Sequence, residues 1–152
     1  MPAIPKTFLD SIFLQAGREY PRECCGMILG IVGKNNFSRT RAFKNAQDEY
    51  HAKDPENFPR TSSTAYFMDP GELLLLQKEL RESEEEIRVI YHSHIDAPAH
   101  FSAEDKRMAV CDGSPLYPGV DYLVVSVMQG KVKEVCLYRW KDKGTGYFLI
   151  KK

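Results

Sequence analysis

Two histidines separated by a single residue, His92 and His94, have a spacing that suits a metal site. They end an apolar stretch, residues 87–94, whose three β-branched residues predict a β-strand. Residues i and i+2 of a strand point to the same face, roughly 7 Å apart along the chain. The two imidazoles can therefore converge on one metal ion, whereas Ser93 between them points away.

A third ligand has to come from another element, and Asp105 fits this role. A helix is predicted to begin at Ser102 and to end near residues 112–113, after a loop long enough to fold back toward the strand. Two imidazoles and a carboxylate leave a fourth tetrahedral position open for water, as in a catalytic zinc site. Ser102 and Asp105 also suit helix capping, which would hold Asp105 in place and is compatible with metal binding.

An overlapping pattern allows a second interpretation of the same histidines. His92, His94 and Asp96 form an H-x-H-x-D pattern that resembles the metallo-β-lactamase signature. That signature continues with histidine, where this chain has Ala97, and needs further histidines downstream, where only His100 remains. An amidohydrolase barrel also uses H-x-H, but it needs about 250 residues, whereas this chain has 152. The metallo-β-lactamase interpretation is therefore the weaker one.

Helices and strands alternate along the chain and must position these side chains. Apolar spacing predicts a helix over residues 6–16, and the run Asp69-Pro70-Gly71-Glu72 predicts the start of another. The predicted strands are residues 27–32, 37–43, 64–68, 87–94, 120–128, 132–140 and 147–150, with Gln129-Gly130 as a hairpin turn. We therefore expect an α/β or α+β fold, a mixed sheet with about three helices, in one domain over residues 1–152.

One segment, residues 45–63, has no clear hydrophobic periodicity. Residues 45–63 are polar and contain Pro55 and Pro59. An irregular segment of this length in a compact domain is usually functional or mobile. We therefore expect a long loop with a functional role here.

The composition excludes several classes of protein. Hydrophobic residues make up 43% of the chain, as in a globular domain. The 21 basic and 21 acidic side chains give a formal net charge of zero, so the cation excess needed for nucleic-acid binding is missing. No apolar run approaches the roughly 20 residues of a membrane span, and no secretory signal is recognisable. Four cysteines without a C-x-x-C pair favour reduced thiols and a cytoplasmic location.

The histidine pattern and its continuation resemble the motif of the JAMM (MPN+) zinc metallopeptidases. The motif is His92-x-His94, then seven residues, then Ser102-x-x-Asp105, and it is highly specific. One departure is Ile95, because many members have proline after the second histidine. This difference affects the shape of the loop and not the ligands.

Two further segments extend the resemblance over roughly residues 6–140. Residues 21–30 (PRECCGMILG) are similar to the family's glutamate segment, and residues 117–127 are similar to its bacterial members. The resemblance implies a curved mixed sheet of the cytidine-deaminase-like type. It also implies one zinc ion per chain, with Glu23 as the general base and Ser102 as a stabiliser of the oxyanion.

The resemblance further implies a substrate. Bacterial stand-alone members resemble enzymes that hydrolyse the amide bond after the C-terminal Gly-Gly of a ubiquitin-like or sulfur-carrier protein. A flexible Gly-Gly tail can add as an extended strand at a sheet edge, and residues 45–63 are a candidate wall for its groove. The alternative is a non-catalytic MPN-type interaction module, but such scaffolds typically lack the metal ligands. No pattern in the sequence specifies an oligomeric state.

Overall fold

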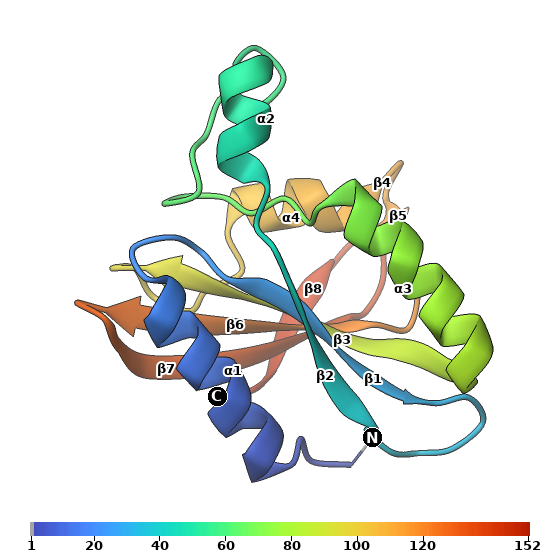
Figure 1. Ribbon diagram of the computed structural model, residues 1–152. Coiled ribbons are helices and arrows are strands. Elements are labelled where there is room, and N and C mark those ends of the chain that lie inside the picture. Colours follow the sequence, from blue (N-terminus) through green and yellow to red (C-terminus); the bar gives the residue numbers. More distant parts are fainter. Residues whose placement is uncertain (1) are drawn as a thin grey trace.

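The computed structural model describes residues 2–152 and contains a six-stranded sheet with the order β2-β1-β3-β6-β7-β8 (Figure 1). The strands of this sheet are β1 (Cys25–Ile31), β2 (Arg39–Phe43), β3 (Glu85–Ile95), β6 (Asp121–Met128), β7 (Lys131–Trp140) and β8 (Tyr147–Lys151). The helices are α1 (Lys6–Glu19), α2 (Gln47–Lys53), α3 (Pro70–Ser83) and α4 (Ala103–Ala109). A separate two-stranded ribbon pairs β4 (Val110–Cys111) with β5 (Ser114–Pro115). The predicted mixed α+β fold is thus confirmed.

The centre of the sheet is β3, which pairs with β1 on one side and β6 on the other. The β1–β3 pair is antiparallel and the β3–β6 pair is parallel. Two neighbouring parallel strands cannot be joined by a tight turn and need a longer crossover, usually with a helix. Here the crossover contains α4, which therefore lies above the carboxyl end of β3 (Figure 1).

The helices cover the two faces of the sheet unequally. Side chains of α3 and α4 pack with one face, and side chains of α1 pack with the other (Figure 1). Along β3 the side chains alternate accordingly, with Ile90 in the core under α3 and α4, and Val89 and Tyr91 in the core under α1. By the same alternation, His92 and His94 point to the face that carries α4.

Local signals in the sequence account for several of these boundaries. The Asp69 carboxylate caps α3 by accepting a 3.1 Å hydrogen bond from the Glu72 backbone N–H, and Pro70 takes the first helical position. Gln129 and Gly130 join β6 to β7 with positive φ angles of 50° and 81°. This is the geometry of a two-residue type I′ hairpin, so the predicted hairpin is confirmed.

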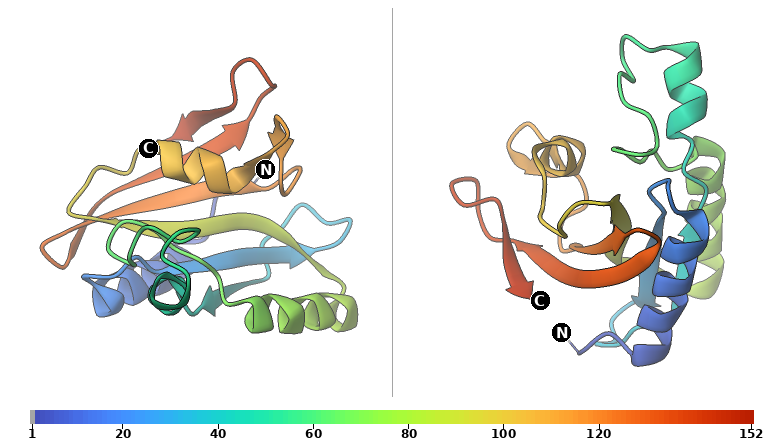
Figure 2. Two further views of the ribbon diagram at one scale, coloured as in Figure 1. Left: turned by 90° about the horizontal axis from the view of Figure 1, so that it is seen from above. Right: turned by 90° about the vertical axis from the view of Figure 1, so that its left-hand side faces the viewer.

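The segment predicted to be irregular differs from the expectation. It contains a fourth helix, α2, which stands away from the sheet (Figure 2, right). Acidic residues occupy the first turn of α2 and basic residues its last turn, an arrangement that favours a short polar helix through its dipole. The prediction of a strand at residues 64–68 is also wrong, because only Met68 makes a ladder contact there, as an isolated bridge with Asn45.

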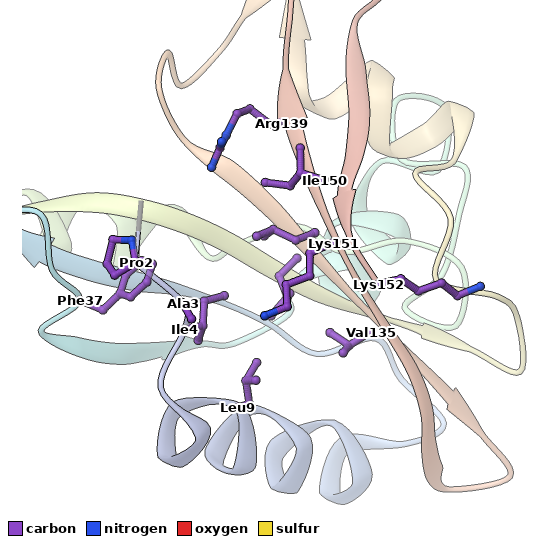
Figure 3. Close-up of a pocket in the computed structure, with 12 residues that line it drawn as sticks. Pro2, Ala3, Ile4, Leu9, Phe37, Val135, Arg139, Ile150, Lys151 and Lys152 are labelled. Carbon is purple, nitrogen blue, oxygen red and sulfur yellow. The ribbon is translucent and has the colours of Figure 1, made fainter.

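The face that carries α1 is only partly covered by it. A pocket of about 390 Å³ remains between the amino-terminal residues, α1 and the outer strands β7 and β8 (Figure 3). Its walls include Ile4, Leu9, Val135 and Ile150. Among residues 2–152, no helix has the length and apolarity that crossing a membrane requires.

A close approach between β1 and β3 fixes the register next to the histidines. A Cβ atom on Gly26 would lie 2.1 Å from the Tyr91 hydroxyl oxygen. That hydroxyl donates a 2.5 Å hydrogen bond to the Gln15 side chain, which in turn donates to the Cys25 carbonyl at 3.1 Å. Glycine at this position therefore lets one tyrosine connect β3 with α1.

We expect Gly26→Ala to lower the free energy of unfolding by about 1–3 kcal/mol, because the added methyl group has no space against Tyr91. Denaturant melts of the metal-free protein measure this change. Gly144→Ala is the matched control, since its nearest neighbour would be Asp142 Oδ1 at 3.5 Å, and it should stay within about 0.5 kcal/mol of wild type. Equal stability of the two variants would contradict the packing described.

Candidate metal centre

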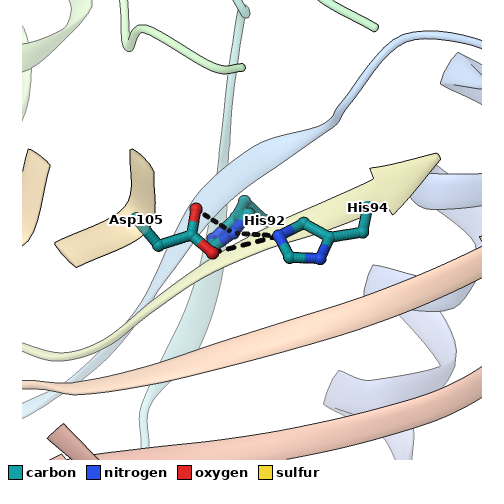
Figure 4. A group of neighbouring side chains, drawn as sticks. All are labelled: His92, His94 and Asp105. Carbon is teal, nitrogen blue, oxygen red and sulfur yellow. Dashed lines mark hydrogen bonds and ion pairs between the residues drawn. The ribbon is translucent and has the colours of Figure 1, made fainter. Parts of the chain in front are cut away.

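Three buried side chains converge at the carboxyl end of β3 (Figure 4). The Nε2 atoms of His92 and His94 lie 3.2 Å apart. The Asp105 carboxylate approaches both, with Oδ1 at 2.9 Å from His92 Nε2 and Oδ2 at 3.0 Å from His94 Nε2. The structure thus brings together the three residues that the sequence predicts as metal ligands.

The geometry of this group fits a metal ion. Zinc bonds to imidazole nitrogen and carboxylate oxygen measure about 2.0–2.1 Å, so neighbouring ligand atoms of a tetrahedral site lie about 3.3 Å apart. The two imidazole Nε2 atoms are 3.2 Å apart, which is close to this value. With one ligand atom taken from each of the three residues, all of these atoms lie within 4.8 Å of one another. The group can therefore hold a metal ion.

Two local features place Asp105. Its backbone N–H donates to Ser102 Oγ at 3.1 Å, and its Oδ2 accepts from the Ser102 backbone N–H at 2.9 Å. This is a complete capping box at the start of α4. The expected capping role is thus confirmed, and it fixes the carboxylate that faces the histidines.

Burial and mutual contact set the charges of the group. Burial lowers the pKa of His92 below its usual value, although Asp105 opposes this shift. Burial also disfavours protonation of His94, but contacts with Asp105 and the Pro98 carbonyl outweigh burial and raise its pKa. Burial alone would raise the pKa of Asp105, but the two imidazoles hold it well below its usual range. In the metal-free group the imidazoles therefore favour the ionised form of the Asp105 carboxylate.

The two imidazoles are held in different ways. His94 Nδ1 lies 2.8 Å from the Pro98 carbonyl oxygen, the kind of second contact that commonly orients a metal-binding histidine. His92 Nδ1 is buried and has no hydrogen-bond partner among the described residues. Instead, the ring of Tyr66 stacks on His92 with centroids 4.6 Å apart and planes inclined by 23°. Tyr66 could not be predicted from the sequence, because no spacing links it to the histidines.

Glu23 lies in the loop before β1 and is only 4% exposed. Its backbone N–H donates to the Ser62 carbonyl at 2.7 Å. The next residue, Cys24, is joined to β3 by two hydrogen bonds with Ser93, of 2.7 and 3.1 Å. Ser93 thus points away from the metal centre, as predicted, and anchors the segment that carries Glu23.

Glu23 is buried, and charges of the metal centre act on its carboxyl group. Burial raises the pKa of its carboxyl group to about 8, and the charge of Asp105 adds to this effect. His94 and Arg60 act in the opposite direction. A carboxyl group in this setting can exchange a proton near neutral pH, which suits a general acid or base.

The structure separates Asp96 from the metal centre. Asp96 is exposed and accepts hydrogen bonds of 2.7 Å from the Tyr20 hydroxyl and the Gln129 backbone N–H. Its ligand role in the metallo-β-lactamase interpretation therefore has no support. His100, by contrast, is exposed and lies edge-on to His94 with ring centroids 5.4 Å apart.

A comparison with known protein families matches most of the chain. The family described as prokaryotic homologs of the JAB domain matches residues 5–141. The chain belongs to this family. The resemblance to the JAMM (MPN+) motif found in the sequence is therefore confirmed.

The individual relatives of this JAB-domain protein share less than 30% of its residues. A CysO-cysteine peptidase of Mycobacterium tuberculosis, and that of Mycobacterium bovis, are each 28% identical over 134 residues, covering 88% of this chain and 79% of the relative. A solution structure from Desulfitobacterium hafniense has a TM-score of 0.69 at 24% identity, covering 96% of this chain and 87% of that one. One from Salinibacter ruber has a TM-score of 0.64 at 24% identity, covering 99% and 89%. The two structures support the fold.

Metal analysis tests the ligand set of this JAB-domain protein. We expect the purified wild type to retain about one zinc per chain after dialysis, and His92→Ala and Asp105→Ala to lose it, because each removes one of three ligands. Asp96→Ala is the matched control and should retain zinc. Loss of zinc from Asp96→Ala but not from Asp105→Ala would contradict the assignment of Asp105 as a ligand.

The raised pKa of Glu23 leads to a pH-dependent stability. The pKa of Glu23 is 4.5 in the unfolded chain and about 8 in the folded protein. Between these two pH values the folded state binds more protons than the unfolded state. The stability that protonated Glu23 contributes is therefore lost as pH rises. The glutamine in Glu23→Gln cannot ionise. The melting temperature of this variant minus that of wild type should therefore increase from pH 5 to pH 9. Calorimetry of the metal-free proteins measures this difference. A difference that is constant across this range would contradict the buried carboxyl group.

Proposed function

We propose that this JAB-domain protein is a zinc-dependent peptidase that hydrolyses the amide bond after the C-terminal Gly-Gly of a ubiquitin-like or sulfur-carrier protein. The observation that carries the proposal is the convergence of His92, His94 and Asp105 within hydrogen-bond distance of one another. Family membership and the peptidase names of the mycobacterial relatives support the reaction type. The carrier substrate is supported by the same names.

The residues around the centre suit amide hydrolysis. Zinc held by His92, His94 and Asp105 would supply Lewis acidity, which lowers the pKa of water and polarises a carbonyl group. Glu23 accepts a proton from the attacking water and passes it to the leaving amine, as its raised pKa allows.

Ser102 retains a free donor for this reaction. A hydroxyl group carries one donor and two acceptor lone pairs. Ser102 Oγ uses an acceptor position for the Asp105 backbone N–H at 3.1 Å. Its O–H therefore remains able to donate to the oxyanion that develops on the scissile carbonyl, a contact worth about 2.7–4 kcal/mol in other enzymes.

The substrate tail has a candidate path beside the centre. Residues 54–63 run from the end of α2 past the face of α4 (Figure 2). The Ser62 carbonyl in this segment binds the Glu23 backbone, so the segment borders the site directly. We assign it the role of groove wall, against which a Gly-Gly tail without side chains lies extended.

The non-catalytic alternative explains the centre less well. Three ionisable side chains are buried there, and burying charged groups is costly unless they are paired or bind metal. His92 Nδ1 adds a buried polar atom without a partner. An interaction module needs none of these features.

Hydrolysis of a defined peptide tests the proposal. The zinc-loaded protein should release cysteine from a peptide or carrier ending in Gly-Gly-Cys. Mass spectrometry measures the release. Glu23→Gln should lower kcat by about 10²- to 10⁴-fold, because it removes the proton transfer, while the exposed control Glu82→Gln should match wild type. No cleavage by wild type, or cleavage by Glu23→Gln at the wild-type rate, would contradict it.

A further inference from the structure

A pocket of about 220 Å³ lies between the groove wall and α4. Apolar side chains form part of its lining, namely Phe58, Phe67 and Met108. Arg60, Glu104 and Arg107 form its charged part. The pocket is thus smaller than the roughly 300–1,000 Å³ of most small-molecule sites, and it combines an apolar surface with guanidinium groups.

The charged part carries a net positive charge, because two arginines share one carboxylate. Arg107 donates two hydrogen bonds to Glu104, at 2.6 and 3.1 Å. The Arg60 guanidinium approaches Glu104 only to 3.7 Å and is 48% exposed. Arg60 therefore keeps most of its hydrogen-bonding capacity for an anion, and guanidinium groups bind carboxylates in a paired geometry.

Side chains of α2 hold the wall of the pocket in place. Gln47 Nε2 donates to the Arg60 carbonyl at 2.9 Å, and His51 Nδ1 lies 2.7 Å from the Phe58 carbonyl oxygen. Asp48 accepts two hydrogen bonds of 2.7 Å from Ser62. These contacts position Phe58 and Arg60 before a ligand arrives, which reduces the entropy cost of binding.

The two walls of the pocket belong to segments that also contact or carry residues of the candidate metal centre. On α4, Glu104 directly precedes the ligand Asp105. On the other wall, Ser62 binds the backbone of Glu23, and Arg60 is close enough for its charge to lower the pKa of Glu23. A group seated in the pocket is therefore held between the same two segments that position Asp105 and Glu23.

We propose that this pocket binds the amino acid on the leaving side of the scissile bond, with Arg60 and Arg107 binding its free α-carboxylate. This inference rests on the proposed function. A Gly-Gly tail has no side chain to fill an apolar pocket and no charge to pair with arginine, whereas a terminal amino acid has both. The protein is thereby specific for carrier conjugates that end in one free amino acid, and it discriminates against carriers joined to a lysine of another protein.

Two peptides that differ by one charge test this inference. Both end in Gly-Gly-Cys with uncharged residues before Gly-Gly, one with a free carboxylate and one with a C-terminal carboxamide. For the zinc-loaded wild type, kcat/KM should be about 10- to 100-fold higher for the carboxylate, since hydrogen bonds to charged groups are lost in the amide. Arg60→Gln should remove most of this preference, because kcat/KM should fall much further for the carboxylate peptide, through a higher KM, than for the amide peptide.

A matched control and a binding measurement complete the test. Lys106→Gln removes an exposed cation from the same helix outside the pocket and should keep the wild-type preference. Calorimetry with the Glu23→Gln protein should show tighter binding of the carboxylate peptide than of the amide. Equal cleavage of both peptides, or an equal loss for both in Arg60→Gln, would overturn the inference while leaving the proposed function intact. Failure to cleave either peptide would contradict the proposed function itself.

Discussion

One buried carboxylate contacts two imidazoles, and this contact requires the start of α4 to meet the carboxyl end of β3. Asp105 faces His92 and His94 at 2.9 and 3.0 Å, in a region with almost no exposure to solvent. A buried carboxylate is strongly destabilising unless it is paired and hydrogen-bonded. Both conditions are met here, because the imidazoles pair with its oxygens and the Ser102 backbone N–H donates to Oδ2.

The fold provides this contact through its strand order. Parallel pairing of β3 with β6 requires a crossover, and the crossover places α4 over the end of β3. The antiparallel partner β1 brings Glu23 to the same end, because Cys24 is bonded to Ser93 between the two histidines. The connection after β2 forms α2 and the groove wall, whose Ser62 carbonyl accepts a hydrogen bond from the Glu23 backbone N–H. Segments from four parts of the chain thus meet at one point.

Features that depend on neighbouring residues could be predicted from the sequence. Alternation along a strand places His92 and His94 on one face, and capping preferences place Ser102 and Asp105 at a helix start; both follow from neighbouring residues. The hairpin at Gln129 and Gly130 is of the same kind, since a two-residue turn with positive φ angles has a narrow choice of residues.

The features that could not be predicted depend on contacts between segments that are distant in the sequence. The helix α2 has little apolar periodicity, and its loop is held by side-chain contacts such as Asp48 with Ser62. Tyr66 belongs to a segment without a ladder, so its position over His92 has no signature in sequence spacing. Glu23 resembles other loop carboxylates until the fold buries it, and only the family motif distinguishes it. Arg60 likewise becomes notable only when the wall is placed opposite α4.

X-ray absorption at the zinc edge of the zinc-loaded protein tests the central claim most directly. The account predicts a shell of nitrogen and oxygen atoms at about 2.0–2.1 Å, with the outer scattering of two imidazole rings and no sulfur. A sulfur shell at about 2.3 Å, or scattering from fewer than two imidazoles, would contradict it.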